Sequence, residues 1–331
     1  MDISVIVCTY NPDERLFKKC LHSIKNLQTD EVAAEIIIVD NNSTTPVSSL
    51  DYVKEFLCDV GYSRIVVEQE QGLTYARIAG FQQSSGDLII FFDDDNEPFP
   101  DYLIQAKNIL ADRPFVGVMG PGYINVQYLD PVDPWISNRL NKYFQEKNAA
   151  REEYILSVMN WFPCYPPGTG QIIRRSVFDF YQEFFRNQGS TISDRKGNDL
   201  SSAGDSQIIW TCLNLNHAVG HHPNIRINHL IPAKRANLDY LKRLSYALEL
   251  SGTLAFVEMY PNRKTAYQRY KMSTFFFDLF KIYFNGIKNR EIKNIKVNIG
   301  TLIGRNQAYV TMSKRKVPFA LEKAKRIYKI F

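Results

Sequence analysis

The first 120 residues repeat one pattern of apolar and polar positions. Short continuous apolar runs, rich in β-branched residues, alternate with segments in which apolar residues recur every three or four positions. Runs of the first kind predict buried strands, and segments of the second kind predict amphipathic helices. The predicted strands are 3–7, 35–39, 64–68, 88–92 and 116–119, and the predicted helices are 12–27, 52–60 and 74–83. This alternation is typical of an α/β fold: a doubly wound, Rossmann-like, mostly parallel sheet flanked by helices.

The pattern changes after residue 121. Residues 122–165 are rich in Tyr, Trp, Pro and Asn, and one amphipathic helix is predicted near 134–151. Residues 166–232 return to short mixed elements. From residue 236 onward the apolar spacing predicts a helical C-terminal extension, with helices near 236–250, 267–283 and 314–330. We therefore divide the chain into three segments, 1–121, 122–232 and 233–331.

The charges are divided between these segments. Residues 1–230 carry 19 Lys and Arg against 29 Asp and Glu, a net charge of −10, whereas residues 231–331 carry 21 against 6, a net charge of +15. Basic helices interleaved with Phe, Tyr and Ile indicate contact with an anionic membrane surface. The alternatives are a solvated helical face that covers the core, or a contact in a homodimer. Nucleic-acid binding is disfavoured because the rest of the chain is acidic and no recognition motif is present.

The cysteines and the apolar runs argue against several classes of protein. The five cysteines are scattered, odd in number and never spaced C-x-x-C, so a disulfide scaffold or a zinc module is disfavoured and a reducing compartment is expected. Position 2 is acidic and no basic segment precedes an apolar run, so no signal peptide is expected. The longest apolar run, 275–284, is too short to span a bilayer. We expect a cytoplasmic protein, peripheral at the inner face of the plasma membrane.

Three carboxylates, Asp93, Asp94 and Asp95, directly follow the predicted strand 88–92. Adjacent carboxylates repel one another unless a cation is present, and their oxygens suit Mg²⁺ or Mn²⁺ bridged to phosphates. The alternative is a solvated acidic turn closed by Pro98. The position at the carboxyl end of a strand favours a ligand site. A dinucleotide-dependent dehydrogenase and a P-loop NTPase are disfavoured, because neither G-x-G-x-x-G nor a Walker-A sequence occurs.

Four segments, taken in order, resemble the N-terminal half of family-2 glycosyltransferases, which are inverting enzymes with the GT-A fold. They are SVIVCTYN (4–11), EIIIVDNNST (35–44), GLTYARIAGF (72–81) and GDLIIFFDDDNEP (86–98). A single D-x-D is a weak signal, whereas this ordered set is specific. The resemblance is to the bacterial surface-polysaccharide type. It implies that residues 1–121 bind the nucleotide-sugar and that residues 122–232 bind the acceptor and supply the catalytic base.

The resemblance also implies roles for single residues. Asp95 matches the metal-binding position of the D-x-D motif for Mn²⁺ or Mg²⁺, and His229, in NHLIP, resembles a segment near that metal. Ile78 stands where the family usually has Asn. The residues implied to bind the nucleotide-sugar are Thr9, Tyr10, Asn11, Asp40, Arg77, Asp93 and Asp94.

Two later segments extend the resemblance. SSAGDSQIIW (201–210) resembles the motif that carries the general base, here Asp205, although Gly204 replaces the usual Glu. PPGTGQIIRRSVF (166–178) resembles the acceptor segment. The residues expected to bind the acceptor are Trp161, Tyr165, Gly168, Thr169 and Gly170.

The function implied is sugar transfer from a nucleoside-diphosphate sugar, with a UDP-sugar as the first expectation. The acceptor would be a hydroxyl of a glycan or lipid-linked oligosaccharide, in capsule, O-antigen or exopolysaccharide synthesis. One alternative is a non-catalytic GT-A-fold scaffold acting through its basic C-terminal region. The joint presence of Asp40, Asp93, Asp95 and Asp205 favours the enzyme. A nucleotidylyltransferase is a weaker alternative, since its glycine-rich N-terminal loop is absent.

Overall fold

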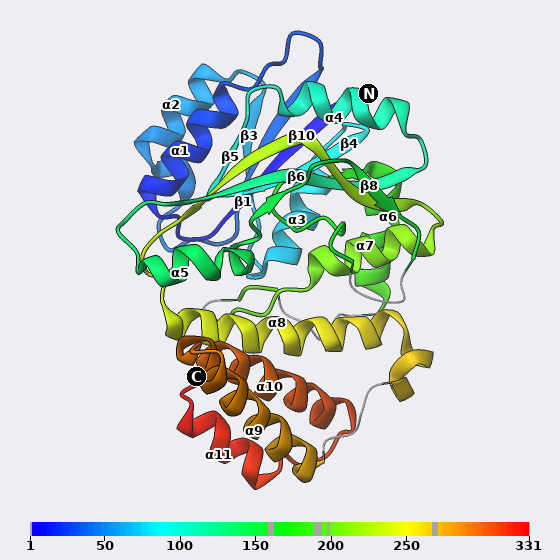
Figure 1. Ribbon diagram of the computed structural model, residues 1–331. Helices are drawn as coiled ribbons and strands as arrows, with labels where there is room; N and C mark the ends of the chain where they lie inside the picture. The colour runs from blue at the N-terminus through cyan, green and yellow to red at the C-terminus, as the bar shows by residue number, and fades with distance from the viewer. Residues whose placement is uncertain (1, 158–161, 189–193, 197–198, 267–270, 331) are drawn as a thin grey trace. The chain divides into compact units, whose positions relative to one another are not determined.

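The chain folds into two units (Figure 1). The computed structural model describes residues 2–157, 162–188, 194–196, 199–266 and 271–330, so Trp161 lies outside the described residues. Unit 1 comprises Met1–Leu129, Phe144–Gly189 and Gly204–Ile231. Unit 2 comprises Asp130–Tyr143, Ser190–Ala203 and Pro232–Phe331, so the C-terminal helices share it with two earlier segments.

The N-terminal half of unit 1 confirms the predicted alternation of strands and helices. Its four strands are parallel and lie in the order β3-β2-β1-β4. The helix α1 begins after Asp13, whose carboxylate accepts a hydrogen bond from the Arg15 backbone N–H. The elements are β1 (Ile3–Thr9), α1 (Glu14–Lys25), β2 (Ala34–Asp40), η1 (Val47–Ser49), α2 (Asp51–Asp59), β3 (Ser63–Val67), α3 (Leu73–Gln82) and β4 (Leu88–Asp93).

The second half of unit 1 continues the same sheet in a mixed arrangement. The full order is β3-β2-β1-β4-β9-β6-β10-β5, with β7 on β6 and β8 on β10. β9 is antiparallel to both β4 and β6, β5 is antiparallel to β10, and β6 and β10 are parallel. The elements are β5 (Asn96–Pro98), α4 (Tyr102–Asp112), β6 (Val116–Tyr128), β7 (Lys147–Asn148), β8 (Glu153–Ile155), β9 (Gln171–Arg174), α6 (Arg175–Gln188), α7 (Gly204–Asn214) and β10 (Ala218–Ile231).

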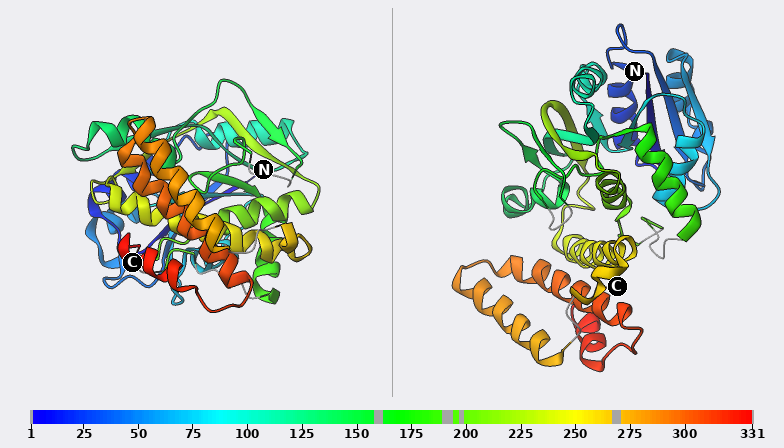
Figure 2. Two further views of the ribbon diagram at one scale, coloured as in Figure 1. Left: turned by 60° about the horizontal axis from the view of Figure 1, so that its bottom comes forward. Right: turned by 90° about the vertical axis from the view of Figure 1, so that its right-hand side faces the viewer.

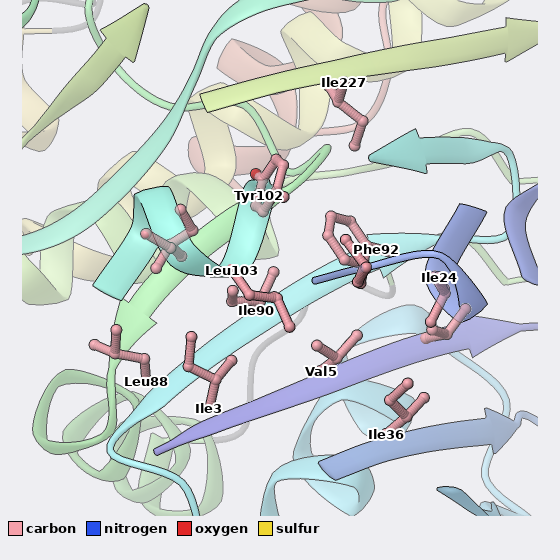
Figure 3. Close-up of a cluster of buried hydrophobic side chains, with 14 of the residues drawn as sticks. Ile3, Val5, Ile24, Ile36, Leu88, Ile90, Phe92, Tyr102, Leu103 and Ile227 are labelled. Atoms are coloured by element: carbon pink, nitrogen blue, oxygen red, sulfur yellow. The ribbon is translucent and has the colours of Figure 1, made fainter. Parts of the chain in front are cut away.

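One face of the sheet carries the main hydrophobic core. In Figure 3, Val5 of β1 and Ile90 of β4 extend towards the side chains of α1 and α4, among them Ile24 and Leu103. Alternate strand residues point to opposite faces, so the residues between these positions face the other side of the sheet. Burial of each such aliphatic side chain contributes about 1.5–3 kcal/mol, which makes this sheet a rigid support for the residues at its edge.

The prediction of one helix over about 134–151 is wrong, because the helix in this segment is much shorter. The structure has a short helix, α5 (Pro134–Arg139), then a 3₁₀ turn, η2 (Asn141–Phe144), and then β7. Gln145 has a φ of 66°, which an α-helix does not allow, and Lys147 pairs with Ile124 of β6. Pairing with the sheet therefore overrides the helical spacing of this segment.

Unit 2 is built mainly from helices around α10 (Ile292–Met312), which contacts α8 (Leu238–Met259), α9 (Met272–Lys288) and α11 (Phe319–Ile327) (Figure 2). A short 3₁₀ segment, η3 (Pro261–Ala266), follows α8. Gly300 and Gly304 let α10 approach α8 closely, because added Cβ atoms would lie 2.3 Å from the Lys242 carbonyl oxygen and 2.4 Å from that of Tyr246. None of the helices described here has the length and apolar character needed to cross a bilayer.

Glu35 ties three strands of unit 1 together and makes stability depend on pH. Its carboxylate accepts hydrogen bonds from Ser4 Oγ at 2.6 Å, from Ser85 N at 2.6 Å and from Arg64 Nη2 at 2.7 Å. Burial by itself raises the pKa of Glu35, but these hydrogen bonds outweigh it and lower the pKa to about 2. Since a carboxyl in the unfolded chain has a pKa of about 4.3, the stabilisation is complete above that pH and is lost as the pH falls towards 2.

We expect Glu35→Gln to lower the melting temperature at pH 7 by several degrees and to flatten its fall between pH 5 and pH 2. Thermal unfolding followed by circular dichroism at pH 7, pH 5 and pH 2 measures both effects. Asp51→Asn is the control, since Asp51 forms an exposed pair with Lys54 at 2.8 Å and such pairs contribute little. Parallel pH dependence in Glu35→Gln and wild type would contradict this prediction.

Candidate active site

The carboxyl ends of three parallel strands meet at one edge of the sheet. Thr9 at the end of β1 is in register with Asp40 at the end of β2, and Cys8 is in register with Asp93 at the end of β4. The Thr9 hydroxyl donates to Asp94 Oδ2 at 2.6 Å, which links the first loop to the acidic turn. Three of the segments singled out by sequence therefore converge here.

Cys8 does not act as a nucleophile at this edge. It is buried, and burial together with the nearby Asp93 and Asp94 carboxylates raises the pKa of its thiol to about 12, despite the opposing effect of Arg77. A neutral thiol is a poor nucleophile, so Cys8 is not a candidate for that role.

The loop after β1 and the loop after β2 hold each other in place. Asn11 has a φ of 47°; its N–H donates to Ser43 Oγ at 2.9 Å and its Oδ1 accepts from Thr44 N at 2.8 Å. The Asp40 carboxylate accepts from Ser43 N at 2.9 Å and from Val47 N at 2.8 Å. Each carboxylate oxygen retains further acceptor capacity, so these bonds position Asp40 without exhausting it. Tyr10, between these loops, is 38% exposed.

The acidic turn points its carboxylates in different directions. Asn96 is fully buried: its Oδ1 accepts from the Asp93 N–H at 3.1 Å, and its Nδ2 donates to Asp95 Oδ1 at 2.9 Å. The Asp93 side chain is 32% exposed, whereas that of Asp95 is 8% exposed. Asn96 therefore fixes the turn, a role that the sequence did not reveal although the residue directly follows the three carboxylates.

Asp95 faces His229, which comes from a strand more than 130 residues later. The antiparallel pairing of β5 with β10 places His229 opposite Asn96, and His229 Nε2 lies 3.4 Å from Asp95 Oδ2. His229 Nδ1 lies 2.8 Å from the Phe144 carbonyl oxygen. A carbonyl only accepts, so Nδ1 carries the proton, and in the neutral imidazole Nε2 presents its lone pair towards the Asp95 carboxylate.

This pair fits a divalent cation. Two ligands at about 2.1 Å from one ion lie roughly 3–3.5 Å apart, and a histidine that donates its other N–H to a carbonyl is the usual form of a metal ligand. Across the described part of the chain, no group of three or more His, Cys, Asp or Glu side chains is arranged to hold a metal. An ion at this position would therefore complete its coordination with water and with phosphate oxygens, as Mg²⁺ commonly does.

Arg77 brings a buried cation to the same edge. Its Nη2 lies 4.0 Å from Asp93 Oδ1, and its guanidinium lies 5.3 Å from the centre of the Phe91 ring. The helix that carries it, α3, starts where the Gly72 N–H donates to Asn41 Oδ1 at 2.8 Å. Ile78 is buried in this helix, so an apolar packing residue occupies the position at which Asn was expected.

Asp205, Arg77 and Gly168 lie together. A Cβ added to Gly168 would lie 3.2 Å from Arg77 Nη2 and 3.3 Å from Asp205 Oδ2. Asp205 is in the first turn of α7, where its Oδ1 accepts from the Ser206 N–H at 2.8 Å and the helix dipole favours its negative charge. One carboxylate oxygen therefore serves the helix start, and the other faces Gly168 and Arg77.

The segment after Gly168 contains buried polar groups without partners. Thr169 Oγ1 and both amide atoms of Gln171 are buried and have no hydrogen-bond partner among the described residues. Gln171 is in register with Phe91, the ring that lies beneath Arg77, while its neighbour Ile172 belongs to the core on the other face of the sheet. Buried amides without partners are uncommon and costly, which marks this position as a candidate for ligand contact.

Two other residues expected to bind the acceptor are held inside the fold. Gly170 has a φ of 66°, and its carbonyl oxygen accepts from the Tyr102 hydroxyl. Tyr165 is 3% exposed, packs on Phe162 and donates its hydroxyl to the Ser157 carbonyl. Tyr165 thus acts as a packing residue here, and its contact with an acceptor remains a prediction, as does that of Trp161, outside the described residues.

Three comparisons relate this chain to known proteins. Glycosyltransferase AglE of Haloferax volcanii is 26% identical over 163 residues, 48% of this chain and 51% of AglE, so the chain spans about half the length of that relative. A glucosyl-dolichyl phosphate glucuronosyltransferase of the same organism is 23% identical over 257 residues, 73% of each protein. The mannosyltransferase PcManGT of Pyrobaculum calidifontis was solved with GDP-Man and Mn²⁺ and is 18% identical in sequence to this chain. The two structures superpose with a TM-score of 0.52 over 99% of this chain and 80% of the PcManGT chain.

The structural likeness to PcManGT confirms the predicted GT-A-like α/β fold with a helical C-terminal region. The family model named Glycosyl transferase family 2 matches residues 4–181, more than half of the chain. That range contains β1 to β4, the acidic turn and the segment around Gly168. The chain belongs to glycosyl transferase family 2.

Proposed function

We propose that the chain is an inverting glycosyltransferase that moves a sugar from a nucleoside-diphosphate sugar to a hydroxyl of a glycan or lipid-linked oligosaccharide. The observation that carries the proposal is the convergence of Arg77 and Asp205 on Gly168, at the sheet edge that also holds Asp93. A cation for the diphosphate and a carboxylate for the acceptor proton are then close together. A UDP-sugar is the first expectation for the donor, and capsule, O-antigen or exopolysaccharide synthesis is the expected pathway.

Donor binding is assigned to the loops at the ends of β1, β2 and β4. The Asp40 carboxylate would accept hydrogen bonds from the base or the ribose. The first loop, Thr9 to Asn11, would line the same nucleotide site. Asp93 and Asp94 would contact the ribose and the sugar side of the donor. Arg77 would compensate the charge of the diphosphate, because its guanidinium is buried and already fixed over Phe91. PcManGT, which was solved with a nucleotide-sugar, supports this class of donor.

Asp95 and His229 would hold the Mn²⁺ or Mg²⁺ ion. When bound, such an ion supplies electrophilic stabilisation of the charge that develops on the leaving diphosphate. Phe144 orients His229 through its carbonyl, and Asn96 orients Asp95 through its amide. Each proposed ligand is therefore held by a hydrogen bond on the side away from the ion, as metal ligands in proteins usually are.

Asp205 would act as the general base. As the acceptor oxygen forms a bond with the anomeric carbon, the bond from that carbon to the diphosphate breaks and the acceptor proton moves to Asp205 Oδ2. Attack from the face opposite the leaving group inverts the configuration in one step. Gly168 and Thr169 would form the acceptor side, since Gly168 leaves the space between the base and Arg77 open. Gly170, whose carbonyl accepts from Tyr102, would support this segment from inside the fold.

A binding experiment separates this proposal from the scaffold alternative. Thermal shifts with UDP-, GDP- and dTDP-sugars, each with and without Mn²⁺, should show a metal-dependent rise in melting temperature for one nucleotide. The stabilised pair is then used in a transfer and hydrolysis assay. A flat response to every donor would favour a scaffold with no catalytic role.

Gln171→Met should separate ligand binding from stability. Removing the buried amide, which has no partner, should raise the melting temperature by a few degrees, since such a group costs about 1–3 kcal/mol. If the amide binds a sugar hydroxyl, the same change should raise the KM for one substrate roughly tenfold. Steady-state kinetics and calorimetry on one preparation measure both effects.

The control for this prediction is Gln82→Met, at an exposed position on α3. This substitution should change neither the melting temperature nor the KM. A lower melting temperature with an unchanged KM in Gln171→Met would mean that the amide binds a structural water. That result would remove Gln171 from the substrate site.

We infer that the chain works in a reducing compartment, the cytoplasm, at a membrane surface. All five cysteines are unpaired and four of them are buried, which fits a reducing compartment. A lipid-linked acceptor would present its hydroxyl at the cytoplasmic face of the membrane. Homodimer formation remains a prediction.

A further inference from the structure

The helix α9 carries a row of large apolar side chains that are exposed. This α9 outer face runs along the helix at a spacing of three to four residues, and its members are between 39% and 66% exposed. It consists of Met272, Phe276, Phe277, Phe280, Tyr283, Phe284 and Ile287. Single exposed apolar residues are ordinary, whereas a contiguous row of aromatic ones marks an interaction surface.

The opposite side of α9 is already buried against α10. Phe275 is 1% exposed, and Leu279 and Ile282 pack on the same cluster, which includes Ile295. Gly286 lies so close to α10 that an added Cβ would meet the Ile295 side chain at 2.3 Å. A helix that is apolar on two sides normally has both covered, so the outer face lacks a partner among the described residues.

Cations flank the α9 outer face. Lys281 and Lys288 lie along one edge of it on the helix, and Lys281 Nζ is 4.6 Å from the centre of the Phe277 ring. On the other edge the Tyr283 hydroxyl is 2.8 Å from that of Tyr328, which brings α11 alongside. α11 contributes further exposed cations, Lys323 and Arg326.

Two of the acidic residues nearby have partners of their own. Glu291 pairs with Arg139 at 2.9 Å and Glu322 pairs with Lys325 at 3.2 Å, while Asp278, the single carboxylate of α9, is partly buried. Among the residues that the structure describes, five exposed cations on and beside α9 and α11 have no ion pair: Lys281, Lys288, Arg290, Lys323 and Arg326. The region therefore presents uncompensated positive charge beside an apolar surface.

We propose that the α9 outer face inserts into the boundary between headgroups and acyl chains of an anionic phospholipid bilayer. The apolar row would enter the acyl region, and the flanking lysines would reach the phosphates with their aliphatic stems along the surface. A helix of 17 residues is about 25 Å long, and with polar residues along one side it lies in the membrane plane and does not span it.

The positive charge around the α9 outer face favours an anionic bilayer over a second copy of the chain as its partner. Two copies that paired through their α9 outer faces would bring two sets of unpaired cations together, which opposes association. An anionic bilayer covers the apolar row and neutralises the cations at the same time. Membrane binding needs neither donor nor metal, so its test is independent of the proposed transfer activity.

The test is co-sedimentation of the full chain with vesicles of phosphatidylcholine, with and without phosphatidylglycerol. Wild type should bind the anionic vesicles and bind the neutral ones at least tenfold more weakly. The double variant Phe280→Ser with Phe284→Ser should lose at least tenfold in partitioning, because both side chains are more than half exposed and their removal leaves the core intact. Phe180→Ser is the matched control, since this residue of α6 is 53% exposed and should not matter.

A second variant tests the electrostatic part. Lys281→Gln with Lys288→Gln should weaken binding to anionic vesicles by about 25-fold, at about fivefold per cation, and should reduce its salt dependence. Absence of wild-type binding to anionic vesicles, or equal binding by the Phe280 and Phe284 double variant, would overturn the proposal. A lipid-free dimer in size-exclusion chromatography that this double variant abolishes would overturn it as well, and would assign the face to a second copy.

Discussion

We expect the Asp205→Asn variant to transfer sugar about 10²–10⁴ times more slowly than wild type, with little change in its affinity for the donor. An amide cannot accept the acceptor proton, so the step that makes the attacking oxygen nucleophilic is lost. The fold should be retained, since Asn Oδ1 can still accept from the Ser206 N–H, and the loss of the charge in the first turn of α7 costs only about 0.3–1 kcal/mol. The variant should therefore have a lower kcat and a nearly unchanged affinity for the donor.

Rapid-quench measurement of a single turnover, together with donor binding by calorimetry, separates the two quantities. Asp179→Asn, an exposed carboxylate on α6, is the control and should behave as wild type. If Asp205→Asn kept more than about a tenth of the wild-type rate, the base would have to be another residue.

The parts of the fold that sequence predicts are those set by local pattern. The strands β1, β2 and β4 are uninterrupted apolar runs such as Ile36–Val39, because each is buried on both faces of the sheet. Their carboxyl ends converge in any parallel sheet, so the neighbourhood of Thr9, Asp40 and Asp93 follows from the order of the strands. The donor side of the candidate site is therefore predictable from the sequence alone.

The parts that sequence does not predict depend on pairing between distant segments. β9 enters the sheet antiparallel between β4 and β6, and only that insertion places Gln171 beside Phe91. Likewise, β10 pairs with β5 across more than 120 residues and so brings His229 to Asp95, a proximity that only the family resemblance of the NHLIP segment implied. No local spacing encodes either contact.

Helix α10 shows a different limit. Its sequence contains Gly300 and Gly304 and several β-branched residues, all weak helix formers, and residues 292–312 are not singled out as a helix within the predicted helical extension. The same glycines are what allow its close approach to the backbone of α8. Tertiary packing therefore stabilises a helix whose intrinsic propensity is low, and the small residues that hide it from sequence are the ones its packing requires.

The second large effect is expected at the metal position. Asp95→Asn should reduce transfer about 10³-fold and weaken Mn²⁺ binding in the presence of nucleotide, because an amide oxygen is a much poorer ligand for a divalent cation than a carboxylate. A loss of this size corresponds to about 4 kcal/mol, which is reasonable for a group that stabilises the leaving diphosphate only through the metal. The variant should fold, since its side-chain oxygen can still accept from Asn96 Nδ2.

Electron paramagnetic resonance of bound Mn²⁺ provides the readout that does not depend on activity. Glu97→Gln removes the same charge from the adjoining strand β5, where Glu97 lies 3.8 Å from Lys19. It should change Mn²⁺ affinity by less than about threefold if Asp95 acts as a direct ligand and not only through its electrostatic field. His229→Gln should give an intermediate loss, because the Phe144 carbonyl no longer orients an imidazole lone pair towards Asp95. Equal losses in Asp95→Asn and Glu97→Gln would show that the turn attracts the ion only through its total charge, and the pairing of Asp95 with His229 would then have a structural role alone.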